Sequence, residues 1–290
     1  MQHPHLKGET NMEKTLGYLG PPGTFSHEAA LNYCKGRACR LKPFATIKQI
    51  FAATANKTVD AGIVPVENSL EGSLNLTFDL LAGNIAVKIK GELHCRVRHC
   101  LLAPPGLKIE GIEKVYSHPQ ALAQCRRYLE KILPKAAPIA ATSTTDAALQ
   151  VAQYNNRGAA IASRRAAELY RLAVLQENIQ DGPGENKTRF LLLAPEDASA
   201  TGRDKTSLLL TLPDRPGALY AALGIFAHHN LNLTKIESRP VRGNLGKYIF
   251  FLDVTGHRKD ARLAEALLET KEKNIKVKIL GSYPRAENCE

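Results

Sequence analysis

The chain has 290 residues, 44% of them hydrophobic and 23% charged, which is the composition of an ordinary globular protein. Its net charge of +11 is spread along the chain and aromatics are only 6%, so no basic stripe with stacking rings predicts nucleic-acid binding. No apolar run approaches the roughly 20 residues that cross a bilayer, and the polar N-terminus lacks a signal-peptide core. We therefore expect a cytoplasmic protein with no membrane partner, and the positive charge suits an anionic small molecule.

The six cysteines show no disulfide-framework spacing and predict reduced thiols. His94-Cys95 and His99-Cys100 are the one candidate metal cluster. In an extended segment, four residues separate the two pairs by roughly 13 Å. One zinc ion, about 2.3 Å from its sulfur ligands, could not hold both pairs, so we expect no metal.

We expect the polar residues 1–14 to form a disordered extension and residues 15–20 to form a strand. The strand breaks at Gly20-Pro21-Pro22-Gly23, and Thr24-Phe25-Ser26 then opens an Ala-rich helix. A Gly-rich turn with hydroxyls at a helix N-terminus presents free amides to an anion. It lacks the lysine of a phosphate-binding loop, so a nucleotide site is not expected.

The next units repeat the strand–helix pattern. Thr46 and Gln49 form a capping box for a helix. An apolar strand over 59–66 then ends at Glu67-Asn68-Ser69, where ligands gather in open α/β sheets. Asn68 and Ser69 equally suit the N-cap of the following helix, and local sequence leaves both interpretations open.

Residues 85–103 form two extended segments suited to crossing between two lobes. A second unit follows, with a strand over 114–117 and a helix opened by Pro119, and Gln124 lies off the apolar face of that helix. Ser143 and Asp146 start another helix, and a strand over 158–163 and a helix over 164–170 complete the unit.

The loop at 180–190 places Thr188 and Arg189 where a polar segment meets the strand Leu191-Leu192-Leu193. Thr188 could donate a hydrogen bond to a leaving oxygen, and Arg189 could grip a carboxylate. The loop alone favours the ordinary interpretation, in which Thr188 is a residue at the start of a strand and Arg189 is a surface cation. A polar linker over 195–204 then leads to a βαββαβ pattern over 205–285, which predicts a separate ferredoxin-like domain.

Seven stretches together resemble the prephenate dehydratase family in its own motif order. They are Gly20–Ser26, Val64–Ser69, Tyr116–Gln120 with Gln124-Cys125, Ser143–Thr145 with Ala147-Ala148, Asn186–Phe190, Gly217–Tyr220 and Glu237–Pro240. The likeness runs from about Leu16 to Tyr283. At Arg171 the resemblance implies glycine, and this departure concerns only the local turn.

The resemblance implies an α/β fold with a two-lobed catalytic domain of the type II periplasmic-binding-protein kind over 15–194 and an ACT regulatory domain over 205–285. Lobe 1 would span about 15–93 and 175–194, and lobe 2 about 94–174. Only residues 1–14 precede the first strand, so we expect no fused chorismate mutase helices. The active site would lie between the lobes.

The implied reaction removes carbon dioxide and water from prephenate to give phenylpyruvate, without a cofactor because aromatisation drives it. Family motifs imply catalytic roles for Thr188, Asn68, Ser117 and Gln124. They imply substrate contacts for Thr24, Ser26, Glu67, Ser69, Thr144, Arg189 and Phe190, although Arg189 could instead brace Glu67.

The ACT motifs imply a phenylalanine site made by Gly217, Ala218, Leu219, Tyr220, Glu237, Ser238, Arg239 and Pro240, between paired domains of a dimer of dimers. Two alternatives stay open: an arogenate dehydratase, or a non-catalytic amino-acid sensor.

Overall fold

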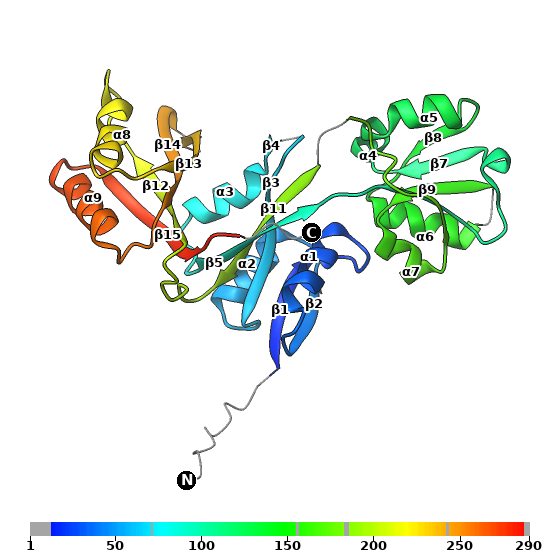
Figure 1. Cartoon of the computed structure of the whole chain (residues 1–290), viewed down its shortest axis with the longest axis horizontal. Helices are drawn as coiled ribbons and strands as arrows, with labels where there is room; N and C mark the ends of the chain where they lie inside the picture. Colours follow the sequence, from blue (N-terminus) through cyan, green and yellow to red (C-terminus); the bar gives the residue numbers. More distant parts are fainter. Residues whose placement is uncertain (1–12, 71, 155–156, 183–185, 242–243, 287–290) are drawn as a thin grey trace, which may run out of the picture.

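The computed structural model describes residues 13–70, 72–154, 157–182, 186–241 and 244–286. The predicted disorder of the N-terminal extension therefore falls on residues outside this range, apart from the last two. Two α/β lobes lie beside one another, and a third domain packs against the first lobe on the side away from the second (Figure 1).

The first lobe is built on a sheet of order β2-β1-β3-β11-β5, with the short β4 paired to β3. Its strands are β1 (Lys14–Leu19), β2 (Cys39–Phe44), β3 (Ala61–Asn68), β4 (Gly72–Ser73), β5 (Lys88–Arg96) and β11 (Lys187–Ala194). Its helices are α1 (Phe25–Cys34), α2 (Ile47–Ala55) and α3 (Asn75–Ala82). The predicted capping box at Thr46 and Gln49 is confirmed at the start of α2.

The second lobe has a sheet of order β10-β6-β9-β7-β8. Its strands are β6 (Cys100–Ala103), β7 (Lys114–Ser117), β8 (Ala137–Ala140), β9 (Gly158–Ala162) and β10 (Ala173–Gln176). The helical segments are η1 (Ile109–Gly111), α4 (Pro119–Gln124), α5 (Arg126–Ile132), α6 (Thr144–Tyr154) and α7 (Arg164–Tyr170). The single helix predicted after Pro119 is two helices, which meet at Cys125.

The lobes exchange the chain at slightly different places from those predicted. β5 stays in the first sheet as far as Arg96, and β10 stays in the second sheet as far as Gln176. The chain therefore leaves the first sheet after Arg96 and the second sheet after Gln176, rather than after 93 and 174. Both strands end where their backbone hydrogen bonds to a neighbour end, which a hydrophobic pattern does not reveal.

The C-terminal domain has the predicted βαββαβ order. Its elements are β12 (Asp204–Thr211), α8 (Ala218–His228), β13 (Leu233–Val241), β14 (Asn244–Thr255), α9 (Ala261–Glu272) and β15 (Lys276–Pro284), and the sheet order is β13-β14-β12-β15. α8 and α9 cover one face of this sheet through a core that includes Leu208, Phe226 and Leu263. The predicted α/β class, with a two-lobed unit followed by a ferredoxin-like domain, is confirmed.

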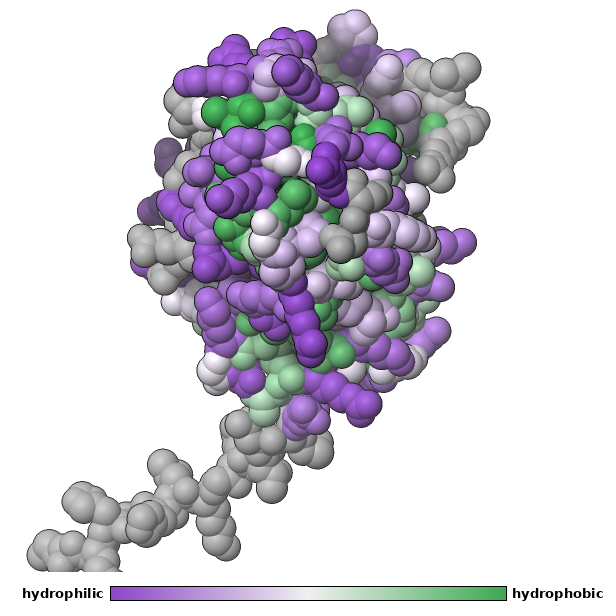
Figure 2. Space-filling view, turned by 90° about the vertical axis from the view of Figure 1, so that its right-hand side faces the viewer, coloured by the Kyte–Doolittle hydropathy of each residue, from purple (hydrophilic) through white to green (hydrophobic). Residues whose placement is uncertain are grey.

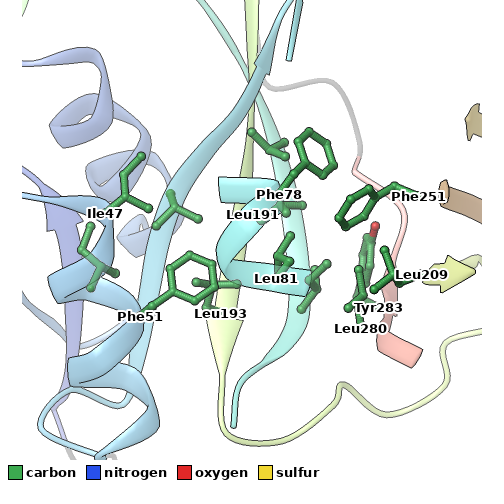
Figure 3. Packing of buried hydrophobic residues seen from close by; sticks show 14 residues of the cluster. Ile47, Phe51, Phe78, Leu81, Leu191, Leu193, Leu209, Phe251, Leu280 and Tyr283 are labelled. Atoms are coloured by element: carbon green, nitrogen blue, oxygen red, sulfur yellow. The ribbon is translucent and has the colours of Figure 1, made fainter. Parts of the chain in front are cut away.

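The other face of the C-terminal sheet shares a core with the first lobe (Figure 3). Phe78 and Leu191 of the lobe belong to the same buried cluster as Phe251 and Tyr283 of the domain, and the rings of Phe78 and Phe251 meet edge to face with centroids 4.7 Å apart. At Gly281 a Cβ atom would lie 2.1 Å from the carbonyl oxygen of Ile89. Only glycine permits this approach of β15 to β5.

The outer surface of the second lobe is mostly polar, with apolar side chains in small patches between charged ones (Figure 2). Its large exposed apolar residues are scattered, as with Ile132, Tyr154 and Leu169. In the part of the chain that the structure describes, no helix is long and apolar enough to cross a membrane.

Candidate active site

A cavity of about 330 Å³ lies between the two lobes, large enough for one small ligand. The first lobe lines it from the start of α1 and from the ends of β3 and β11 that meet in the sheet. The second lobe lines it from α4 and from the start of α6. Six predicted site residues line it together: Thr24, Ser26, Asn68, Gln124, Thr144 and Thr188.

Thr188 and Asn68 stand opposite each other on the paired strands β11 and β3. The amide nitrogen Nδ2 of Asn68 donates to Thr188 Oγ1 at 2.9 Å and to Asn186 Oδ1 at 2.8 Å. Thr188 Oγ1 therefore serves as an acceptor toward Asn68, and no acceptor for its own proton is found among the described residues. A hydroxyl held in this way can donate toward the cavity.

A hydrogen-bonded chain continues from Asn186 across the cleft. Asn186 Nδ2 donates to Gln124 Oε1 at 3.0 Å, and His99 Nε2 lies 2.9 Å from the same oxygen. Because Oε1 accepts from Asn186, Nε2 of His99 carries the proton and Nδ1 is left as an acceptor. Burial lowers the pKa of His99, although the hydrogen bond to Gln124 raises it, and so the ring is neutral near pH 7. Nδ1 is buried and makes no hydrogen bond within the described chain.

Two helices begin at the cavity, one from each lobe. Thr24 caps α1 by accepting from the backbone of His27 at 3.2 Å, and Ser143 accepts from the backbone of Asp146 at 2.9 Å at the start of α6. The first-turn amides of a helix attract carboxylates. No lysine or arginine appears among the described residues that line the cavity, so the hydroxyls and helix amides are its anion-attracting groups.

Two serines predicted for the site do not line the cavity. Ser117 is fully buried, and its hydroxyl donates to the carbonyl oxygen of Ile161 at 2.6 Å, which fixes the end of β7 against β9. Ser69 is exposed, and its hydroxyl accepts from the backbone of Lys187 at 3.0 Å. Ser117 therefore supports the segment that leads into α4, and Ser69 closes the end of the β3–β11 pair.

Three further predicted contacts, Glu67, Arg189 and Phe190, also lie away from the cavity. Arg189 is 8% exposed and pairs with Glu67, Glu92 and Asp253. Its guanidinium therefore faces the C-terminal domain, and not the cavity where it was predicted to grip a substrate carboxylate. The alternative that it braces Glu67 fits these contacts. Phe190 is 1% exposed and packs in the core of the first lobe with Tyr18.

Comparison with known proteins identifies the chain. The family model "Prephenate dehydratase" matches residues 16–198, and "ACT domain" matches residues 206–272. The chain belongs to the prephenate dehydratase family. A bifunctional chorismate mutase/prephenate dehydratase of Aquifex aeolicus is 46% identical over 95% of this chain and 75% of its own length.

Two solved structures cover almost the whole chain. A prephenate dehydratase from Arthrobacter aurescens in complex with L-Phe is 35% identical, covers 95% of this chain and 92% of its own, and superposes with a TM-score of 0.85. A protein described as the quorum-quenching acylase GqqA is 32% identical, covers 94% of this chain and 98% of its own, and superposes with a TM-score of 0.84. The family reaction is dehydration with decarboxylation of prephenate to phenylpyruvate, and it makes this chain a lyase of phenylalanine biosynthesis with an ACT regulatory domain.

The first ACT motif lies at the turn into α8. Gly217 is the N-cap of α8 with φ 78°, a conformation that favours glycine. Ala218 and Leu219 line a hollow of about 130 Å³ with Tyr248 and Phe250, whereas the side chain of Tyr220 is 84% exposed.

The second ACT motif alternates between two faces of β13. The carboxylate of Glu237 accepts a hydrogen bond from the Ser73 hydroxyl, and Arg239 pairs with Asp79 at 2.9 Å, so both contact the first lobe of the same chain. Ser238 and Pro240 are exposed. β13 is an edge strand and pairs only with β14 in the described part of this sheet.

Several cavity residues were not given a role from sequence. Asn186, His118 and Gln120 belong to motifs that were recognised, so their motif membership was the available signal. Phe25 and Ser143 also belong to recognised motifs, Gly20–Ser26 and Ser143–Thr145, and each lies at the predicted start of a helix. His99 was considered only as a metal ligand, and its place in the cleft follows from the lobe crossing at 97–99, which no local pattern marks.

Proposed function

We propose that Thr188 donates a hydrogen bond to the ring hydroxyl of prephenate as that hydroxyl leaves, while Asn68 holds Thr188 in place. The observation that carries this role is the bond from Asn68 Nδ2 to Thr188 Oγ1. It occupies the oxygen as an acceptor and directs the hydroxyl proton elsewhere. As the ring carboxylate departs as carbon dioxide, the electron pair of the broken carbon–carbon bond completes the aromatic ring. The carbon–oxygen bond breaks, and the oxygen leaves as hydroxide, which takes one proton from solvent to become water.

The remaining cavity groups orient the substrate. The two helix starts, with Thr24 and Ser26 on α1 and Thr144 on α6, would receive the two carboxylates. Gln124 and Asn186 would fix the ring between the lobes, and the neutral His99 offers Nδ1 as an acceptor. Positioning of the substrate lowers the barrier by itself. One well-placed donor typically adds a factor of about 10²–10⁴ in rate.

Prephenate is favoured over arogenate by the lining of the cavity. Arogenate carries an ammonium group on its side chain, and binding it would call for a carboxylate nearby. No aspartate or glutamate is among the described residues that line the cavity. Side-by-side assays for phenylpyruvate from prephenate and for phenylalanine from arogenate test this preference, and a higher kcat/KM with arogenate would overturn it.

Thr188→Ala tests the donor role. We expect kcat to fall by about 10²-fold or more with little change in KM, because the hydroxyl matters mainly as the leaving oxygen gains charge. Thr188→Ser keeps the hydroxyl and should retain part of the activity. Turnover of the alanine variant near the wild-type rate would refute the assignment. Formation of phenylpyruvate by the wild-type enzyme would exclude a non-catalytic sensor as the native role.

The ACT domain would bind phenylalanine at the turn into α8, between ACT domains of a dimer of dimers. The hollow beside Ala218 and Leu219 supports this role, and so does the open edge of β13. The same reading puts the enzyme in the cytoplasm, where its pathway would operate.

A further inference from the structure

Neighbouring residues of two paired strands face opposite ways at the active site. Thr188 is paired with Asn68, and Arg189 is paired with Glu67, on β11 and β3. Side chains alternate between the two faces of a sheet. The first pair therefore faces the cleft, and the second pair faces the ACT domain.

The Arg189 guanidinium is held from both sides of that domain boundary. From the first lobe, Glu92 Oε2 accepts from Nε at 2.8 Å. From the ACT domain, Asp253 on β14 lies 2.7 Å from an Nη atom, and the hydroxyl oxygen of Tyr283 on β15 accepts from the other Nη at 3.0 Å. Ser207 on β12 joins these two by donating to Asp253 at 2.6 Å and lying 2.6 Å from the Tyr283 hydroxyl.

Two ACT lysines complete the network on the carboxylates that flank Arg189. Lys205 pairs with Glu92 at 2.9 Å, and Lys235 pairs with Glu67 at 2.5 Å. All four strands of the ACT sheet thus supply a side chain that reaches the β3–β11 pair or its neighbour β5. Arg189, Glu92, Asp253 and Lys205 are each at least nine-tenths buried.

A buried charge network of this kind resists partial displacement. Moving the ACT sheet would pull a partner from a buried charge, which is strongly unfavourable, unless Arg189 and its strand move as well. Because Arg189 directly follows Thr188, any such movement reaches the cleft through one peptide unit.

We propose that Arg189 is a positioning residue, which sets the place of Thr188 and Asn68 in the cleft and makes it depend on the ACT sheet through Asp253 and Tyr283. This rests on the proposed role of Thr188. Effector binding in the ACT domain then changes turnover by shifting the sheet that holds the guanidinium.

The test is Asp253→Asn in the full-length enzyme, which keeps the side-chain size and removes the charge facing Arg189. We expect kcat for prephenate to fall by about 10–100-fold with KM within about twofold, since a small misplacement of a reacting group has that order of cost. Phenylalanine should still bind by calorimetry, but should change kcat less than it does in the wild type. Tyr283→Phe removes a single hydroxyl. It should lower kcat and reduce the effect of phenylalanine on kcat, both by a smaller factor than Asp253→Asn.

Lys88→Gln is the matched control. Lys88 also joins the first lobe to the ACT domain, by donating to the carbonyl oxygen of Ile279 at 2.8 Å, but it is not among the partners of Arg189. Its kinetics and its response to phenylalanine should match the wild type.

Wild-type kcat and a full response to phenylalanine in folded Asp253→Asn or Tyr283→Phe would overturn the proposal. So would equal losses in Lys88→Gln, because they would reflect a loosened domain contact. If Thr188→Ala is inactive while the Asp253 and Tyr283 variants behave as wild type, the proposed role of Arg189 is refuted and the donor role of Thr188 is retained. If Thr188→Ala is active, the donor role itself falls.

Discussion

At the residue scale, Arg171 shows how one side chain stores avoidable strain. It ends α7 in the left-handed conformation, with φ 54° and ψ 40°. A residue with a Cβ atom pays roughly 1–2 kcal/mol there, whereas glycine adopts this conformation readily. The resemblance to the family had already implied glycine at this position.

Arg171→Gly should therefore stabilise the protein by about 0.5–1 kcal/mol, since the relief of strain exceeds the extra entropy of glycine in the unfolded chain. Urea unfolding followed by circular dichroism measures the change, and catalysis should be unaffected because Arg171 is not among the residues lining the cavity. Arg171→Ala is the control, because alanine keeps the Cβ atom and should give no such gain. Equal stability of the glycine and arginine forms would show that the turn is unstrained.

Motif membership found Thr188, Asn68 and Gln124 correctly as cavity residues, but it could not separate them from their neighbours. Arg189 and Glu67 belong to the same motifs and lie behind the cleft. Thr188 and Arg189 lie on opposite faces of the sheet. Side-chain alternation along β11 predicts this separation once Thr188 is assigned to the strand and not to the loop. Hydrogen bonds between residues distant in sequence, such as that between His99 and Gln124, cannot be predicted from a local sequence pattern.

At the scale of elements, the strongly patterned helices and strands were predictable. Three strands, β2, β8 and β10, were not predicted, and all three lie at sheet edges. Edge strands bury fewer side chains, as in β2, where no residue is fully buried, and so their hydrophobic pattern is weak. The contact of β15 with β5 at Gly281 joins segments about 190 residues apart and could not be read from either segment alone.

The boundary between β5, β11 and the ACT sheet also predicts a sensitivity to acid. Burial would raise the pKa of Glu92, but Arg189 and Lys205 outweigh burial and lower that pKa. Burial likewise opposes the lowering of the pKa of Glu67, which Lys235 and Arg189 cause. A carboxyl with a lowered folded-state pKa contributes stability above its unfolded pKa, about 4.3, and loses it as pH falls through the folded value. We expect the free energy of unfolding to fall steeply as pH drops below about 4.3.

Glu92→Gln should weaken that dependence. The variant should be less stable at pH 7, because Arg189 and Lys205 lose a buried partner, but its stability should change less between pH 5 and lower values than that of the wild type. Urea unfolding at a series of pH values measures how the free energy of unfolding changes with pH in Glu92→Gln and in the wild type. Glu130→Gln, which removes an exposed helix pair with Arg126, should keep the wild-type slope, and identical slopes for Glu92→Gln and wild type would show that Glu92 does not cause the effect.

At the scale of the whole molecule, the ACT domain is part of the catalytic unit's core. Phe78, Leu191 and Ile89 are buried in one cluster with Leu209 and Leu280 (Figure 3). Deleting the chain after Asp204 would expose that apolar surface and leave buried charges unpaired. Regulation is therefore better tested in the full-length enzyme than by truncation.

The last prediction concerns binding at two sites of the intact enzyme. If phenylalanine lowers affinity for substrate, thermodynamic linkage requires a substrate analogue to lower affinity for phenylalanine by the same factor, and couplings of about 1–3 kcal/mol give roughly 5–150-fold. Calorimetric titration of phenylalanine, with and without a saturating competitive analogue of prephenate, measures that factor directly. Gly217→Ala is the companion variant: it places a Cβ atom at φ 78° where phenylalanine is proposed to approach the backbone, and it should weaken phenylalanine binding while prephenate turnover without effector persists. If the full-length enzyme neither binds phenylalanine nor slows in its presence, the ACT domain serves assembly and support of Arg189 alone, because the shared core and the buried ion pairs would remain its only contribution to the site.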